Sequence, residues 1–191
     1  MRICVYCASS SKVDKAYFKA TQKLGKTIAA RGITLIYGGG SAGLMGCIAD
    51  AVLKDKGQVI GILPRFMEKV EWGHKGLTQL NLVKDMHERK RLLIKDVDGV
   101  VALPGGCGTL EELMEVITLK RLGKFTKPII ILNTNGFYDH LKLLLEKMIH
   151  ERFMRTEHGE IWKFVNLPEE VIPAIENAPI WDSSAIKFAA V

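Results

Sequence analysis

The chain has 191 residues, of which 48% are hydrophobic and 25% are charged, and its formal net charge is +6. This length favours a single domain spanning residues 1–191, with a core that needs no metal ion or disulfide. The mild excess of basic residues is spread over several segments and shows no pattern of interleaved aromatic and basic residues. The sequence also shows no signal-peptide pattern and no apolar run long enough to span a membrane. We therefore expect a small anionic ligand, no nucleic-acid partner, no membrane contact and a cytoplasmic location.

Strand and helix patterns alternate along the chain, starting with a strand at 2–7 and a helix that Asp14 can cap and Gly32 can end. Further strands are predicted, in chain order, at 33–37, 58–63, 80–83, 99–103, 129–132 and 161–165. The later helices are predicted from the glycine-rich connection at 38–46 to about 56, and at 85–95, 109–122, 138–151 and 167–176.

The strand cores are almost wholly apolar, which is typical of a parallel sheet whose two faces are both covered. We therefore predict an α/β fold, a Rossmann-like doubly wound parallel sheet with helices on both faces. Such sheets bind ligands at the carboxyl ends of their strands. The C-terminal tail, 178–191, contains Pro179, Ile180, Trp181 and Phe188, and we expect it to dock against the domain.

The cysteines are Cys4, Cys7, Cys47 and Cys107. Cys4 and Cys7 form a C-x-x-C along the first predicted strand, where side chains three residues apart face opposite sides. This pair is badly placed to bridge or to hold a metal ion, and the sequence offers no second ligand pair beside it. We expect free thiols and no metal site.

The first glycine-rich turn, GGGSAG at 38–43, follows a strand and opens a helix. Glycine lets a backbone approach an anion closely, and the start of a helix offers unpaired amides. A dinucleotide site would also need an acidic residue at the end of the next strand, which instead ends at Leu63 and Pro64. The turn therefore suits a mononucleotide phosphate better than NAD, and the alternative is a tight turn without a ligand.

The second turn, PGGCG at 104–108, also leads into a predicted helix and brings Glu111 and Glu112 into its first turn. A carboxylate beside an anion site needs a role other than holding the anion. Thr109 and Glu112 also fit the T-x-x-E pattern of a capping box, in which Glu112 would return to the N-cap amide. Local sequence leaves the capping and catalytic interpretations open.

The helix at 85–95 places Arg89 and Lys90 on the same face as the apolar Met86 and Leu93. Two cations that point inward need an anionic partner, because an unpaired buried charge is costly. The alternative is that both side chains extend to the solvent.

Residues 104–112 closely resemble the PGGxGTxxE signature of the Lonely Guy (LOG) family, and MHERK at 86–90 resembles the family's M-x-x-R-K signature. The resemblance includes VYCASS at 5–10, YGGG at 37–40 and GLMG at 43–46, and so covers nearly the whole chain. Members are cytokinin riboside 5'-monophosphate phosphoribohydrolases, many formerly labelled lysine decarboxylases.

The resemblance implies that Arg89 and Glu112 are catalytic. It further implies a set of substrate-binding residues: Ser9, Gly39, Gly40, Met45, Glu71, Lys90, Gly105, Gly106, Cys107, Gly108, Thr109, Leu110, Glu111 and Thr118. Cys107 departs from the family, where aromatic or small apolar residues are more usual at this position, which puts the shape of the pocket in question. The resemblance also implies a homodimer.

We therefore predict that the protein hydrolyses the N-glycosidic bond of a cytokinin riboside 5'-monophosphate or of AMP, which gives the free base and ribose 5-phosphate. Such a cleavage builds positive charge on the ribose, which a carboxylate can stabilise, and it requires no cofactor or metal ion. The runner-up is a non-catalytic nucleotide-binding or cofactor-carrier protein. A lysine decarboxylase is disfavoured, since no lysine lies in a recognisable pyridoxal phosphate context.

Overall fold

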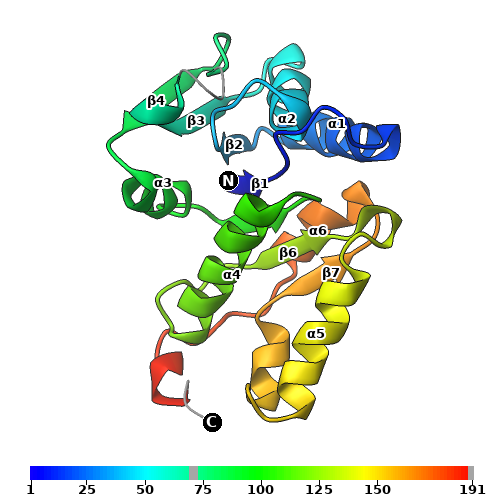
Figure 1. The fold of residues 1–191 in the computed structure, drawn as a ribbon, viewed down its shortest axis with the longest axis vertical. Helices are drawn as coiled ribbons and strands as arrows, with labels where there is room; N and C mark the ends of the chain where they lie inside the picture. Colours follow the sequence, from blue (N-terminus) through cyan, green and yellow to red (C-terminus); the bar gives the residue numbers. More distant parts are fainter. Residues whose placement is uncertain (69–72, 189–191) are drawn as a thin grey trace.

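A computed structural model describes residues 1–68 and 73–188 of the chain (Figure 1). Its strands form one sheet in which every pairing is parallel, in the order β4-β3-β2-β1-β5-β6-β7. They are β1 (Arg2–Tyr6), β2 (Thr34–Tyr37), β3 (Val59–Pro64), β4 (Gln79–Val83), β5 (Gly99–Ala102), β6 (Ile129–Leu132) and β7 (Lys163–Val165).

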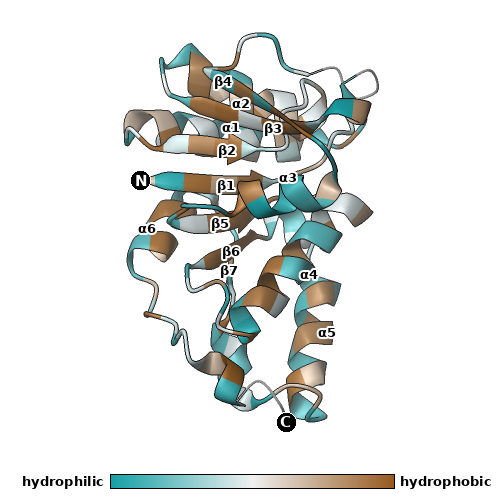
Figure 2. Cartoon of the chain, turned by 90° about the vertical axis from the view of Figure 1, so that its left-hand side faces the viewer, coloured by the Kyte–Doolittle hydropathy of each residue, from teal (hydrophilic) through white to brown (hydrophobic). Residues whose placement is uncertain are grey.

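The helices cover both faces of this sheet. They are α1 (Lys15–Ala30), α2 (Gly43–Lys54), α3 (Met86–Leu93), α4 (Cys107–Arg121), α5 (Asp139–His150) and α6 (Val171–Glu176). Buried residues of α1, α2 and α6 form one hydrophobic cluster with the sheet, and those of α3 and α4, with partly buried residues of α5, form the other. Figure 2 shows this layering where β5, β6 and β7 lie between α6 and α4. The doubly wound fold predicted from the sequence is confirmed.

The chain reverses direction across the sheet between β1 and β5. From β1 it winds outward through β2, β3 and β4, and then returns to place β5 on the other side of β1. The loops that leave β1 and β5 therefore diverge, which opens a crevice at their carboxyl ends. Backbone hydrogen bonds hold these two loops together at their base, from the Leu103 amide to the Tyr6 carbonyl (2.9 Å) and from Ala8 to Pro104 (3.3 Å).

Each predicted strand and helix is present, with shifts of a few residues at the ends. Asp14 caps α1 by accepting from the Ala16 amide, and Gly32 follows the helix with a φ of +63°. Three-residue and five-residue 3-10 helices at Arg65–Met67 and Thr156–Glu160 were not predicted, because such short turns leave no hydrophobic period in the sequence.

The cysteines are free, and part of the C-terminal tail packs against the domain. All four cysteines are free, and Cys4 and Cys7 lie in the two different hydrophobic clusters, as the strand geometry predicted. In the tail, the Trp181 indole N–H donates to the Lys120 carbonyl (2.7 Å) and Ala185 is fully buried, whereas Ile180 is fully exposed. The tail thus docks on α4 through part of its length.

Candidate active site

A cavity of about 300 Å³ lies at the crevice between β1 and β5. Its walls come from the loop after β1, the starts of α2 and α4, α3 and the 3-10 helix after β3. The lining residues are Cys7, Ala8, Ser9, Ser10, Met45, Met67, Met86, Arg89, Gly106, Gly108, Thr109, Glu111 and Glu112. Segments more than 100 residues apart in the sequence thus meet at the point where the fold predicts a ligand.

The start of α4 presents bare backbone to this cavity. Gly106 is the N-cap and supplies no side-chain cap, and the amides of Cys107, Gly108 and Thr109 find no backbone acceptor within residues 1–68 and 73–188. A Cβ atom added at Gly106 or Gly108 would meet no atom within 4 Å in the part of the chain that the structure describes. Free amides at the positive end of a helix, with open space before them, form a site for an anion.

This geometry overturns the capping-box interpretation of Thr109 and Glu112. Helix α4 begins at Cys107, so Thr109 lies inside its first turn and is not the N-cap. Thr109 is 5% exposed and packs against Gly105, where an added Cβ would lie 2.1 Å from the threonine Oγ1. The Glu112 side chain is therefore not needed to close the helix end.

The first glycine-rich turn serves the packing of the protein. The amides of Leu44 and Met45, at the start of α2, both donate to the Ala8 carbonyl (2.9 and 3.2 Å). A Cβ at Gly43 would lie 2.4 Å from the Ser9 backbone, so glycine lets α2 approach the loop after β1. The prediction that the helix-start amides of this turn bind phosphate is wrong for Leu44 and Met45, because Ala8 already occupies them.

Arg89 is buried beside Glu112. Asp85 caps α3 by accepting from the Glu88 amide, which sets the helix so that the Arg89 side chain, 7% exposed, points inward. Its Nη2 lies 3.5 Å from Oε1 of Glu112, whose side chain is 11% exposed. A Cβ at Gly38 would lie 2.5 Å from the same Nη2, so this glycine leaves room for the guanidinium. The inward cation has its anionic partner.

Lys90 pairs with the outer glutamates of α4. Its Nζ lies 2.6 Å from Oε1 of Glu111 and 3.0 Å from Oε2 of Glu115. The hydrogen bond to Glu111 raises the pKa of Lys90 above its usual value, and burial opposes this. The Glu111 side chain is 53% exposed, so it lies at the rim of the cavity, in contrast with the buried Glu112. The alternative in which both cations extend to the solvent is wrong.

The groups behind Glu112 remain neutral. Burial raises the pKa of the Cys7 thiol, and the charge of Glu112 adds to the shift. Burial likewise raises the pKa of the Tyr6 hydroxyl, with smaller contributions from Cys4 and Glu112. Arg89 is therefore the charge that balances Glu112 among these neighbours.

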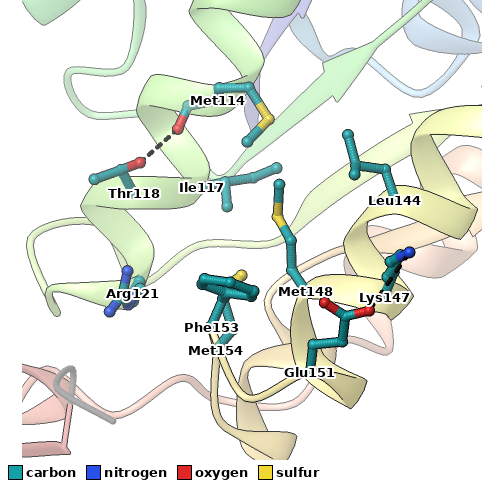
Figure 3. A pocket seen from close by; sticks show the side chains of 10 residues that line it. All are labelled: Met114, Ile117, Thr118, Arg121, Leu144, Lys147, Met148, Glu151, Phe153 and Met154. Atoms are coloured by element: carbon teal, nitrogen blue, oxygen red, sulfur yellow. Dashed lines mark hydrogen bonds and ion pairs between the residues drawn. The ribbon is translucent and has the colours of Figure 1, made fainter.

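The structure places the other residues implied by the family resemblance at varied distances from the cavity. Those that do not line it are Gly39, Gly40, Lys90, Gly105, Cys107, Leu110 and Thr118. Three of these, Gly105, Cys107 and Leu110, lie in or next to the first turn of α4. The Thr118 hydroxyl donates to the Met114 carbonyl (2.8 Å) and faces a groove between α4 and α5 (Figure 3). Glu71 lies outside the described residues.

Some lining residues were not expected from the sequence. Cys7, Ala8 and Ser10 follow β1 at its carboxyl end, and that position alone could have indicated them. Met67 comes from a 3-10 helix with no recognisable pattern, and Met86 was noted only as part of an apolar stripe and of the second signature.

Comparison with known proteins decides the family. A family model described as "Possible lysine decarboxylase" matches residues 45–175. The chain is 41% identical to "Probable cytokinin riboside 5'-monophosphate phosphoribohydrolase LOGL2" of Oryza sativa subsp. japonica, over 92% of this chain and 72% of that protein. It is 40% identical to cytokinin riboside 5'-monophosphate phosphoribohydrolase LOG3 of Arabidopsis thaliana, over 98% and 87%. The chain belongs to the LOG family.

Solved structures extend the same fold beyond the LOG family relatives. The structural-genomics protein TM1055 superposes with a TM-score of 0.71 at 26% identity, over 92% of this chain and 98% of that one. The molybdenum cofactor carrier protein of Chlamydomonas reinhardtii superposes with a TM-score of 0.69 at 19% identity, over 93% and 96%. The second likeness is one of fold alone.

Proposed function

We propose that this LOG family protein is a phosphoribohydrolase. It would hydrolyse the N-glycosidic bond of a cytokinin riboside 5'-monophosphate, of AMP, or of both, to the free base and ribose 5-phosphate. The observation that carries the proposal is the buried Arg89–Glu112 pair, which shares one cavity with the start of α4, whose first amides have no backbone acceptor among the described residues. Relatives that carry the phosphoribohydrolase name at about 40% identity over nearly the full chain support it.

The 5'-phosphate would bind at the start of α4. The amides of Cys107, Gly108 and Thr109 supply donors without a backbone acceptor in the described ranges, and the helix supplies a partial positive charge. A phosphate held there lies away from the bond that breaks, so it contributes orientation. Ser9 and Met45 line the opposite wall and would contact the sugar or the base.

Glu112 would act on the sugar–base bond. As the bond between C1' and the base nitrogen breaks, its electron pair leaves with the base and positive charge develops on the ribose. A carboxylate beside C1' stabilises this charge and accepts a proton from the attacking water, whose oxygen forms the new bond to C1'. That proton finally reaches the departing base. Water is the only co-substrate of this reaction, so we propose no cofactor.

The burial of the two glutamates favours Glu112 over Glu111 in this role. Glu112 is shielded from the solvent, with its Oε1 3.5 Å from Nη2 of Arg89, whereas Glu111 is half-exposed and closely paired with Lys90. Arg89 would orient Glu112, and Lys90 would hold the rim of the site. Gly39, Gly40, Glu71, Gly105, Leu110 and Thr118 remain proposed substrate contacts on the family resemblance.

We also propose a homodimer that pairs through the groove between α4 and α5 (Figure 3). Leu144 and Phe153 are 49% and 70% exposed there. Exposed apolar patches of this kind mark association surfaces. At the edge, Nζ of Lys147 pairs with Oε1 of Glu151 at 3.4 Å, so these two charges already balance each other within one copy. Leu144→Asp should dissociate the dimer in analytical ultracentrifugation, and a monomeric wild-type protein would contradict the pairing.

We place the protein in the cytoplasm, on the basis of its four free cysteines. Among the described residues, none of the helices has both the length and the apolar character needed to cross a bilayer.

The experiment is liquid chromatography of the purified protein after incubation with AMP and with isopentenyladenosine 5'-monophosphate. Release of adenine or isopentenyladenine together with equimolar ribose 5-phosphate is the expected result. Calorimetric titration with the same nucleotides runs in parallel. Binding of both without release of either base would instead identify a nucleotide or cofactor carrier, and would overturn the enzymatic proposal.

A further inference from the structure

The guanidinium of Arg89 has an unusual set of partners. Within residues 1–68 and 73–188, its side-chain partners apart from Glu112 are sulfur atoms: Nη1 donates to Sδ of Met67 at 3.5 Å and to Sδ of Met86 at 3.9 Å. Its Nε atom is buried and has no hydrogen-bond partner within the described parts of the chain. A cation that is 6% exposed is thus held by one loosely placed carboxylate and two thioethers.

Thioether sulfur is a weak acceptor on a polarisable, apolar side chain. It can therefore fix the position of a guanidinium by packing and weak hydrogen bonds without neutralising its charge. A carboxylate or amide at the same place would form strong bonds to Nη1 and turn the guanidinium towards itself. An aliphatic side chain would fill the space but offer no acceptor, leaving Nη1 as poorly satisfied as Nε.

The two methionines come from different elements and enclose one side of the guanidinium. Met67 ends the 3-10 helix Arg65–Met67 after β3, and Met86 opens α3 one turn before Arg89. Both line the cavity together with Arg89 and Glu112. On another side, the backbone of Gly38 approaches Nη2 so closely that a Cβ there would lie 2.5 Å away. The guanidinium is therefore confined, with Nη2 directed towards Glu112.

We propose that Met67 and Met86 are positioning residues, whose thioethers hold Arg89 against Glu112 while leaving its positive charge available to Glu112 and to the ligand. The inference rests on the proposed function in one respect, since it assigns the methionines to the same reaction. Neither residue needs to touch the reacting atoms, because both act through Arg89.

The test compares Met67→Leu, Met86→Leu and the double variant with the wild-type protein. Leucine conserves the volume approximately and removes the sulfur, so the fold is expected to tolerate it. Leu24→Met is the control for repacking, because Leu24 is fully buried in α1, in the cluster on the other face of the sheet from α3 and α4. Thermal unfolding of all variants is measured beside the kinetics.

In the double variant, kcat should fall by about tenfold while KM stays within about threefold, because the interaction lost acts on the transition state and not on the bound phosphate. The acid limb of the pH–rate profile should also move to higher pH, because a nearby cation favours the ionised form of a carboxylate. Among residues 1–68 and 73–188, the titratable groups that face Glu112 include Arg89 and, behind it, Cys4, Tyr6 and Cys7. A role in packing alone would lower stability without moving this limb.

A double variant with wild-type kcat and an unmoved acid limb would overturn the proposal while leaving the phosphoribohydrolase activity established. If the wild-type protein releases no base, the proposed function fails and the crystal structure of the double variant decides the role of the methionines. Displacement of Nη2 from its 3.5 Å position beside Glu112 would then support the positioning role. An Arg89 that stays in place without either sulfur would contradict it.

Discussion

Replacing Gly108 by alanine separates the stability of the fold from the binding of the ligand. Gly108 is the second residue of α4, and an added Cβ would meet no atom of the described residues within 4 Å. Alanine in a helix is favoured over glycine by about 0.5–1 kcal/mol. In a domain of this length each kcal/mol shifts Tm by roughly 2–4 °C, so Gly108→Ala should raise Tm by about 1–4 °C.

The same methyl group would enter the space in which we place the 5'-phosphate. We expect KM for AMP to rise by roughly tenfold or more, which corresponds to about 1.4 kcal/mol of lost binding. The assay combines base release over a range of AMP concentrations with thermal unfolding in the presence and absence of AMP. AMP should raise the Tm of the wild-type protein, and this increase should shrink in the variant.

Gly105→Ala is the matched control, because Gly105 lies three residues before Gly108 and does not line the cavity. Its Cβ would lie 2.1 Å from Oγ1 of the buried Thr109, so this variant should lose stability instead of gaining it. If Gly108→Ala hydrolyses AMP with an unchanged KM, the phosphate does not lie against the start of α4. The open space beside Gly108 would then not be the phosphate site.

Two further predictions concern the rest of the molecule. Gly46→Ala should lower Tm, since its Cβ would lie 2.0 Å from the Ser41 carbonyl oxygen and such overpacking costs about 1–3 kcal/mol; an unchanged melting curve would contradict this. Burial lowers the pKa of Lys120 from 10.5 to about 8, so at neutral pH folding must bury a charge that the unfolded chain keeps in water. Lys120→Met should therefore be more stable than the wild-type protein at pH 7. Denaturant titrations should show that advantage shrinking from about pH 8, where the folded chain loses the proton, towards pH 10.5, where the unfolded chain loses it too. An advantage that does not change with pH would show that the charge of Lys120 plays no part.

Most of the fold could be predicted because its signals are local. Apolar strand cores alternate with amphipathic helices, and capping residues such as Asp14 and Asp85 mark where helices begin. The alternation and the handedness of parallel crossovers predict a doubly wound sheet, but they do not determine the order of its strands. The 3-10 helix that ends at Met67 could not be predicted, because a segment of three residues is too short to show the hydrophobic spacing that marks a helix.

The two glycine-rich turns show where local sequence stops being informative. Both follow a strand and open a helix, and both were interpreted as anion sites. The α2 amides of Leu44 and Met45 bind the Ala8 carbonyl, which lies 36 residues before Leu44, whereas the first α4 amides have no backbone acceptor in residues 1–68 and 73–188. That difference depends on how distant loops pack, so it appears only in the folded chain.

The inward-facing cation illustrates the same limit. The helical spacing predicted that Arg89 needs an anion, but it could not identify Glu112 as its partner, nor show that Glu111 belongs to Lys90. Two adjacent glutamates on a helix point in directions that differ by about 100°. Their different burial follows from that rotation, and it distinguishes a buried carboxylate from one at the rim.

The role of Glu112 in cleaving the sugar–base bond is tested most directly by measuring the turnover of Glu112→Gln and of Glu111→Gln, with AMP and isopentenyladenosine 5'-monophosphate as substrates. We expect Glu112→Gln to release no detectable base. It should still bind either nucleotide within about tenfold of the wild-type affinity, which is a difference in binding free energy of less than about 1.4 kcal/mol. Glu111→Gln should retain most of its turnover. Full activity in Glu112→Gln, or loss of activity in Glu111→Gln alone, would contradict the claim that the buried glutamate acts on the sugar–base bond.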